Sequence, residues 1–297
     1  MIRLSLPQKK GGVGKTTLIK ILAEWFSQNK RVLLVDFDDQ CSLSELYLPM
    51  ERIGNGRHKR PPLHPDYTPD NEDHADWTGR SSSADIFYST REIHEYGVAE
   101  FENGRLDILP ADSRELVYVR EQEDKKIRAR IEEIIDKFFG SEGIADMYDL
   151  VLFDTGPNES PLMRGVIRAS TQTIIPVELE QQCISGLDAI IGMVIEEQSR
   201  RSKNHPLELT ALQINKYRKQ LSLHNGLLEQ VMNQERLSQY VSPIIIPSRV
   251  AYAERDVRGL LPASVFQLKP SDPARKIAED WCKFVESKLF PKETADA

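Results

Sequence analysis

The chain has 297 residues, of which 40% are apolar and 29% charged, a composition typical of a globular protein with a sizeable core. With 39 basic and 46 acidic residues its formal net charge is -7, so any DNA contact must come from a local basic patch. The three cysteines are far apart, which excludes a disulfide framework or zinc knuckle. The N-terminal apolar run is too short for a signal peptide, and no run approaches the ~20 apolar residues of a membrane span, so we expect a cytoplasmic protein.

The first elements along the chain predict a strand, a helix and a second strand. Residues 4–6 form a short apolar run that stops at a lysine- and glycine-rich turn. Apolar residues then recur at helical spacing from Leu18 to Phe26. Residues 31–36, RVLLVD, form a continuous apolar strand that ends in an acid. Short elements in this order are typical of a βαβ unit in a buried parallel sheet.

The alternation of strands and helices continues to the C-terminus. Pro176 suggests the end of one strand, and Asp272 with Pro273 marks the start of the last helix. We therefore expect one α/β domain over residues 1–297, a mostly parallel twisted sheet with helices on both faces. The further predicted strands are 106–109, 149–154, 173–177, 209–215 and 242–246, and the predicted helices are 112–139, 186–198 and 273–290.

Residues 51–80 interrupt this pattern with four prolines, three glycines and no apolar periodicity. We interpret them as a surface insertion or mobile loop, and residues 291–297 as a polar tail. The spacing of His58, His64 and His74 matches no compact metal-ligand pattern, so these histidines are interpreted as polar loop residues.

The strongest motif, KKGGVGKTT over residues 9–17, lies between the first strand and the first helix. Glycines allow the backbone amides of such a loop to converge on an anion, and the helix that follows presents its positive dipole end to the same phosphates. We expect Lys15 to reach the β- and γ-phosphates, Thr16 to bind Mg²⁺ and Thr17 to lie near the α-phosphate. The remaining predicted nucleotide-binding residues are Gly11, Gly12, Val13 and Gly14.

This loop resembles the deviant Walker A loop, KGGxGK[ST], of the ParA/MinD family of P-loop ATPases, and most closely the ParA/Soj partition branch. Lys9 replaces the usual first glycine, and Lys10 matches the extra lysine of the family. The resemblance implies that Lys10 crosses a dimer interface to the phosphates of the partner's ATP. Nucleotide state and dimer state would then be coupled.

Two apolar strands end in acids that match further motifs of the family. Residues 36–40, DFDDQ, are similar to its D-x-D-x-Q motif, and the resemblance implies that Asp38 in switch I positions the attacking water and belongs to the Mg²⁺ site with Thr16 and Asp154. The family usually has proline where this chain has Asp39. Residues 150–157, LVLFDTGP, resemble a Walker B strand followed by switch II. Asp154 is expected to hold Mg²⁺ through water, and Gly156 is expected to leave the backbone free to follow the γ-phosphate.

The resemblance continues more weakly in the second half of the chain. Asn215 and Pro247 match positions that the family places near adenine. Residues 200–219 contain six basic residues and one acidic residue, and the ParA branch binds DNA without sequence preference through basic residues of this half. We expect Arg249, Arg255 and Arg258 to contact DNA, although an ordinary solvated face remains the alternative.

The C-terminal residues bear on the choice of branch. Ile277, Trp281 and Leu289 belong to an apolar stripe that we expect to dock on the body of the protein, and the tail carries two acids and one lysine. The basic amphipathic membrane helix of MinD is therefore not expected. Few residues precede the phosphate loop, so we expect no N-terminal helix-turn-helix domain.

The resemblance implies a Mg²⁺-dependent ATPase that forms an ATP-sandwich homodimer and binds nonspecific DNA. It would position a plasmid, a chromosome or another large cargo with a ParB-like or other adaptor that stimulates hydrolysis, in the cytoplasm and on the nucleoid. Three alternatives stay open: a MinD-like membrane-cycling regulator, an iron–sulfur reductase, and a scaffold that senses ATP without turnover. An iron–sulfur reductase would need cysteines in the middle of the chain, and this sequence has none there. The scaffold is disfavoured by the presence of Asp38.

Overall fold

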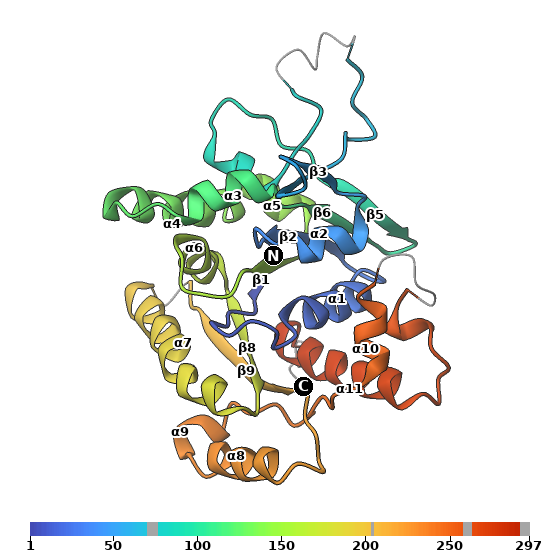
Figure 1. The fold of residues 1–297 in the computed structure, drawn as a ribbon, viewed down its shortest axis with the longest axis vertical. Coiled ribbons are helices and arrows are strands. Elements are labelled where there is room, and N and C mark those ends of the chain that lie inside the picture. Colours follow the sequence, from blue (N-terminus) through green and yellow to red (C-terminus); the bar gives the residue numbers. More distant parts are fainter. Residues whose placement is uncertain (70–76, 203–204, 258–262, 292–297) are drawn as a thin grey trace, which may run out of the picture.

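The computed structural model describes residues 1–69, 77–202, 205–257 and 263–291. Its main sheet contains β1 (Ile2–Ser5), β2 (Arg31–Phe37), β5 (Tyr96–Phe101), β6 (Gly104–Leu109), β7 (Leu150–Thr155), β8 (Gln172–Glu178) and β9 (Glu208–Asn215). The strand order is β5-β6-β2-β7-β1-β8-β9, and only the edge strand β5 runs antiparallel to its neighbour. The predicted α/β fold with a mostly parallel sheet is confirmed (Figure 1).

Alternate residues of the central strands pack against helices on opposite faces of the sheet. Val32 and Leu34 of β2 belong to one core, and Leu33 and Val35 belong to another. Figure 1 shows the two helix layers to the right and to the left of the sheet. The first layer contains α1 (Lys15–Phe26), α10 (Val250–Arg255) and α11 (Pro273–Leu289), and the second contains α3 (Ser113–Arg120), α4 (Lys125–Phe139), α6 (Pro161–Ala169) and α7 (Gln181–Arg200). The shorter elements are α2 (Ser42–Tyr47), α5 (Glu142–Met147), α8 (Ser222–Met232), α9 (Glu235–Ser238), η2 (Ser83–Phe87) and η3 (Val265–Gln267).

The helix predicted over residues 112–139 is two helices, α3 and α4. The Asp112 carboxylate caps α3 by accepting from the amide of Glu115 at 3.1 Å. The Asp124 carboxylate accepts from the amides of Lys126 and Ile127 at 2.8 and 3.1 Å and caps α4 in the same way. A second capping residue inside the predicted helix therefore starts a new one.

Two strand predictions also differ from the structure. Residues 242–246 form no strand: isolated bridges occur at the flanking residues Val241 and Pro247, and Pro243 between them has no amide to donate. Pro176 lies inside β8 instead of ending it, and its carbonyl accepts a hydrogen bond from the Gln8 amide at 2.8 Å.

The described residues between 51 and 95, called the insertion below, contain short regular elements that extend past the predicted insertion of residues 51–80. β3 (Glu51–Ile53) and β4 (His58–Arg60) form an antiparallel hairpin. Further along, η2 begins with a capping box between Ser82 and Asp85. His64 is buried, with its ring centroid 4.7 Å from that of Tyr96, whereas His74 lies outside the described residues. The described part of this segment contains no group of three side chains that could hold a metal ion.

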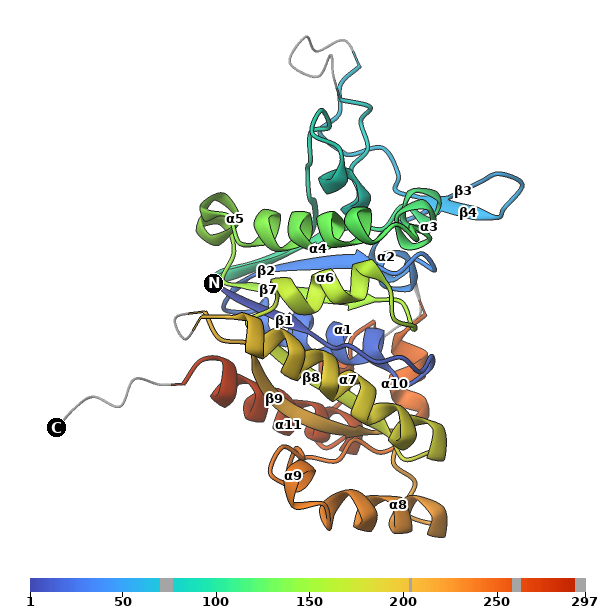
Figure 2. The same cartoon turned by 90° about the vertical axis from the view of Figure 1, so that its left-hand side faces the viewer.

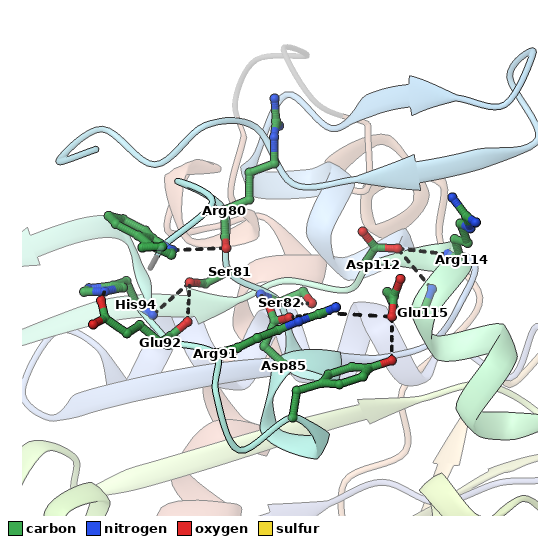
Figure 3. Close-up of polar contacts among 12 residues, drawn as sticks. Arg80, Ser81, Ser82, Asp85, Arg91, Glu92, His94, Asp112, Arg114 and Glu115 are labelled. Atoms are coloured by element: carbon green, nitrogen blue, oxygen red, sulfur yellow. Dashed lines mark hydrogen bonds and ion pairs between the residues drawn. The ribbon is translucent and has the colours of Figure 1, made fainter. Parts of the chain in front are cut away.

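Polar contacts dock the residues around η2 on the N-terminus of α3 (Figure 3). Arg91 pairs with Asp85 at 2.6 Å, and the Tyr88 hydroxyl donates to the Glu115 carboxylate of α3 at 2.7 Å. Figure 2 shows the β3–β4 hairpin projecting beside α3. The insertion therefore holds α3 from its N-terminal end.

Helix α11 closes the first layer, as the apolar stripe predicts. Trp281, Val285 and Leu289 are buried in the core that α1 shares with the sheet. In the described ranges, no helix combines the length and the apolar character that crossing a membrane requires. Of the predicted polar tail, only Pro291 lies within the described residues.

The Trp281 side chain is fully buried, so its removal should test how far α11 stabilises the fold. We expect Trp281→Ala to lower the free energy of unfolding by about 3–5 kcal/mol, because it leaves a large cavity. Urea denaturation followed by circular dichroism measures this loss. Trp281→Phe is the matched control and should cost less, since the indole nitrogen makes no hydrogen bond among the described residues. A small loss for Trp281→Ala would show that α11 is dispensable.

Candidate nucleotide-binding site

The predicted phosphate loop connects the end of β1 to the start of α1, at the carboxyl edge of the sheet. Gly12 and Gly14 have φ values of 77° and 89°, which glycine adopts without strain. A Cβ atom on Gly14 would lie 2.4 Å from the Asn215 side-chain nitrogen. Glycine is therefore required at position 14 by both backbone conformation and space.

Side chains from outside the motif fix the loop. The Asn215 amide donates to the Val13 carbonyl at 2.7 Å, and the Lys216 ammonium donates to the Gly12 carbonyl. The side-chain carbonyl oxygen of the buried Gln8 accepts a hydrogen bond from the backbone amide of Lys9 at 2.8 Å. Sequence analysis missed Gln8 and Lys216. Gln8 directly precedes the loop motif, and Lys216 directly follows the last residue of β9, so their positions could have indicated a role in the site.

Of the three residues predicted for the magnesium site, Thr16, Asp38 and Asp154, the first and the last are in direct contact. The Thr16 hydroxyl donates to one Asp154 carboxylate oxygen at 2.6 Å. The other oxygen, Oδ1, is buried and has no hydrogen-bond partner among the described residues. Burial raises the pKa of Asp154 to about 6, against the opposing effects of Lys15 and Thr16. A buried carboxylate with a free oxygen beside a hydroxyl is a donor set that Mg²⁺ prefers, so these residues fit the predicted cation.

Asp36 at the end of β2 lies opposite Asp154 on the neighbouring strand. It is fully buried and accepts hydrogen bonds from the Ser44 hydroxyl at 2.7 Å and from the Asp38 amide at 3.0 Å. Burial, and then the charges of Asp154 and Asp38, raise its pKa. The saturated Asp36 carboxylate organises the backbone, whereas Asp154 keeps an oxygen free.

Asp38 lines the same cleft as Lys15 and Thr16. One of its oxygens accepts from the Gln40 amide at 3.0 Å, and burial raises its pKa. A Cβ atom on Gly156 would lie 3.1 Å from that oxygen, so glycine permits the close approach of the two predicted switch segments. The structure therefore brings together Lys15, Thr16, Asp38 and Asp154, as the motifs predict.

Lys10 lies apart from this group. Its ammonium pairs with the Glu180 carboxylate at 2.6 Å and with the Glu178 carboxylate at 3.3 Å. Partial burial acts to lower the pKa of Lys10, but these two acids outweigh it and raise the pKa. In the single chain, the second lysine is therefore held by its own glutamates at the end of β8.

The cleft beside the loop has a volume of about 570 Å³ and contains both predicted adenine neighbours. Asn215 and Pro247 lie in its wall, and Arg218 and Arg249 line it with exposed side chains. Gly11, Gly12, Gly14 and Thr17 also line the cleft. Val13 differs, because its side chain is buried and only its main chain is left for contact with a ligand.

Two of the three predicted DNA contacts are not supported by the structure. Arg255 was predicted to be on the surface, but it is only 8% exposed and its Nε and Nη1 atoms are buried without partners among the described residues. The prediction for Arg255 is wrong, because α10 turns this side chain toward α1, where Lys20 donates to the Arg255 carbonyl. Arg258 lies outside the described residues.

A strand–glycine loop–helix junction with a hydroxyl and a carboxylate at its mouth defines a P-loop nucleotide-binding protein. A family model described as "AAA domain" matches residues 2–209. The chain belongs to this family, and within it to the ParA/MinD-like P-loop ATPases.

The curated relatives extend the match over most of the chain. The chromosome-partitioning ATPase Soj of Thermus thermophilus is 26% identical over 285 residues, which cover 94% of this chain and 94% of Soj. Two solved structures share the fold. Apo McdA from Cyanothece has a TM-score of 0.68 at 15% identity and covers 96% of this chain and 99% of its own. A Borrelia burgdorferi protein described as a putative plasmid partition protein, bound to AMPPNP, has a TM-score of 0.64 at 20% identity, covering 97% and 99%.

The raised pKa of Asp154 predicts that this carboxylate destabilises the nucleotide-free protein. Its ordinary pKa is 3.8, so the folded chain binds the proton more tightly than the unfolded chain. The destabilisation by the ionised carboxylate is therefore complete above about pH 6, and it decreases as the pH falls toward the ordinary pKa of 3.8. Without Mg²⁺, Asp154→Asn should raise the free energy of unfolding at neutral pH by roughly 2 kcal/mol, and by less at about pH 5.

Thermal and urea unfolding at the two pH values measure this difference. Asp149→Asn is a control of opposite sign, because hydrogen bonds from Arg31 lower the pKa of Asp149 and its charge stabilises the fold. A loss of stability for Asp154→Asn at neutral pH would contradict the assignment of a strained, unpaired carboxylate.

Proposed function

We propose that the protein is a ParA-type, Mg²⁺-dependent ATPase that dimerises around ATP. The observation that carries the proposal is the contact between Thr16 and Asp154, which leaves one buried carboxylate oxygen free at the phosphate loop. That arrangement matches a Walker A hydroxyl and a Walker B acid around one divalent cation. Its place at the carboxyl edge of a parallel sheet is where α/β proteins bind nucleotides.

Each residue of the site has a distinct part in this proposal. When bound, Mg²⁺ supplies a positive charge that offsets the negative charge of the phosphates. Thr16 and Asp154 hold that cation, and Lys15 pairs with the β- and γ-phosphates of the substrate. Asp38 accepts a hydrogen bond from the attacking water and orients it, and its buried carboxylate lines the same cleft.

Lys10 supports a link between nucleotide and dimerisation. Because the lysine is paired with Glu178 and Glu180 in the single chain, it has to leave them to reach a partner's phosphates. The γ-phosphate of ATP offers charged terminal oxygens as hydrogen-bond acceptors, so ATP on the partner competes with the two carboxylates for Lys10 and favours the transfer. Loss of the γ-phosphate then returns Lys10 to its own glutamates and releases the dimer.

The proposed work of the dimer is to position a large cargo, such as a plasmid or a chromosome, on the nucleoid in the cytoplasm. The name of the Soj relative and the description of the Borrelia neighbour support this branch. Arg218 and Arg249 are exposed at the rim of the cleft, where they form a local basic patch for nonspecific DNA. A ParB-like or other adaptor would stimulate hydrolysis and release DNA. A MinD-like membrane cycle is the alternative, and vesicle flotation with ATP distinguishes it from DNA binding.

Substitution of the two lysines tests the ATP-sandwich dimer. We expect Lys15→Ala to abolish ATP binding, because it removes the cation that holds the phosphates. Lys10→Ala should bind ATP normally but form no ATP-dependent dimer, and its kcat should fall by about 10²-fold. Light scattering after gel filtration and a phosphate-release assay measure these effects.

Lys9→Ala is the matched control, since Lys9 is the adjacent lysine and pairs with Glu159 at 2.7 Å. It should dimerise like the wild type. An ATP-dependent dimer of Lys10→Ala with normal turnover would rule out the role of Lys10 across the interface.

The proposed DNA patch predicts a change in salt dependence. Arg218→Ala and Arg249→Ala should each weaken binding of the ATP dimer to random-sequence duplex DNA and lower the slope of log Kd against log salt by about 1. Fluorescence anisotropy over a salt series measures the slope. Arg236→Ala is the control, because this exposed arginine of α9 pairs with Asp188. Unchanged slopes for both variants would exclude the patch.

A further inference from the structure

Two cations from outside the switch I turn, defined here as residues 38–41, hold it in place. The Lys59 ammonium, from strand β4 of the insertion hairpin, donates to the Gln40 carbonyl at 2.8 Å. The Arg120 guanidinium, from the last turn of α3, pairs with the Asp39 carboxylate. These contacts reach the turn from two elements that are not part of the nucleotide cleft.

The turn is also held from within. The Asp38 amide donates to the Asp36 carboxylate at 3.0 Å, and the Asp38 carboxylate accepts from the Gln40 amide at 3.0 Å. The Cys41 amide then donates to the Asp38 carbonyl at 2.9 Å, with Cys41 at a φ of 56°. Orientation of the Asp38 carboxylate thus depends on where the peptide of Gln40 lies.

The two external contacts differ from ordinary surface ion pairs, which contribute little to stability. The Asp39 side chain is only 7% exposed, so its charge is largely removed from water and Arg120 supplies its partner. Lys59 binds a main-chain carbonyl and also the Glu45 carboxylate at 2.8 Å, which fixes its ammonium in position. Together the two contacts restrain the turn: Lys59 holds its backbone at the Gln40 carbonyl, and Arg120 holds its charge at the Asp39 carboxylate.

The supports of these two cations are themselves fixed. α3 is capped by Asp112 and held by the contacts of Tyr88 and Arg91 with Glu115 (Figure 3). The Ser83 hydroxyl of η2 donates to the Asp36 carbonyl at 2.6 Å, which ties the insertion directly to the end of β2. The family resemblance places proline at position 39, where its ring restricts φ without a partner. In this chain, contacts from the insertion and α3 supply that restriction.

We infer that Arg120 and Lys59 are positioning residues for Asp38, through which the β3–β4 hairpin and α3 set the rate of ATP hydrolysis. This inference rests on the proposed ATPase function. Neither residue lines the cleft, so both act on the turn and not on the substrate. Movement of the hairpin would then change kcat and leave ATP affinity as it is.

Steady-state kinetics separate this role from a structural one. We expect Arg120→Ala, Asp39→Asn and Lys59→Ala each to lower kcat by about tenfold, with KM and the ATP Kd unchanged within about twofold. Arg120→Lys, which keeps the charge, should recover part of the rate. Asp39→Asn removes the charge and nearly preserves the shape of the side chain, so it still tests the ion pair if Arg120→Ala destabilises the fold.

Two matched controls should keep wild-type kcat. Arg60→Ala removes the residue next to Lys59 on the hairpin, which pairs with Glu51. Arg168→Ala removes an arginine 37% exposed, against 38% for Arg120, that pairs with Asp136 at the opposite end of the sheet.

Amide hydrogen exchange tests the positioning independently of turnover. In Arg120→Ala and Lys59→Ala the amides of Gln40 and Cys41 should exchange at least about fivefold faster, while those of β2 stay protected. If the wild type binds ATP without hydrolysing it, the proposed function fails and exchange alone decides the positioning role. Wild-type exchange in these variants, or a loss confined to ATP affinity, would overturn the inference.

Discussion

The site depends on two buried carboxyl groups at the ends of adjacent parallel strands. Asp36 of β2 and Asp154 of β7 are register partners, so the sheet itself forces like charges together where water is excluded. The chain compensates them differently. Asp36 is satisfied by Ser44 and by the backbone that follows it, and it becomes the anchor of the switch I turn. Asp154 receives one hydroxyl and keeps one oxygen free, and the charge of Lys15 offsets only part of the effect of burial.

The position of Lys10 gives the single chain and the proposed dimer different electrostatics. Glu178 and Glu180 satisfy its charge in the monomer, so the lysine adds no cation to the chain's own cleft. Transfer to a partner leaves two carboxylates unpaired at the end of β8, a cost that only a strongly anionic ligand offsets. In the proposed dimer, a single chain would bind a nucleotide, and its full set of cations would be assembled only between two chains.

The sequence predicted the parallel sheet and the residues that gather beside the glycine loop because both follow from local pattern. In a parallel sheet, apolar strands that end in acids place those acids at the same carboxyl edge. Asp38, Asp154 and the glycine loop therefore lie close together, independently of the conformation of the connecting loops. The contacts of Lys10, Lys59 and Arg120 were not predictable, since each joins segments far apart in the chain. Arg255 is a second case in which packing between distant segments decides the outcome. Its spacing from Arg258 suggested an exposed helix face, but packing of α10 against α1 buries it.

Cys41 closes the switch I turn, and its thiol is completely buried, with its pKa raised mainly by that burial. A thiol in this state does not react with an alkylating reagent until the turn opens. Cys183 and Cys282 are equally buried, but they lie within the long helices α7 and α11. The rate at which a reagent modifies Cys41 therefore measures how often the turn beside the glycine loop opens, and the native chain carries its own chemical reporter of that motion.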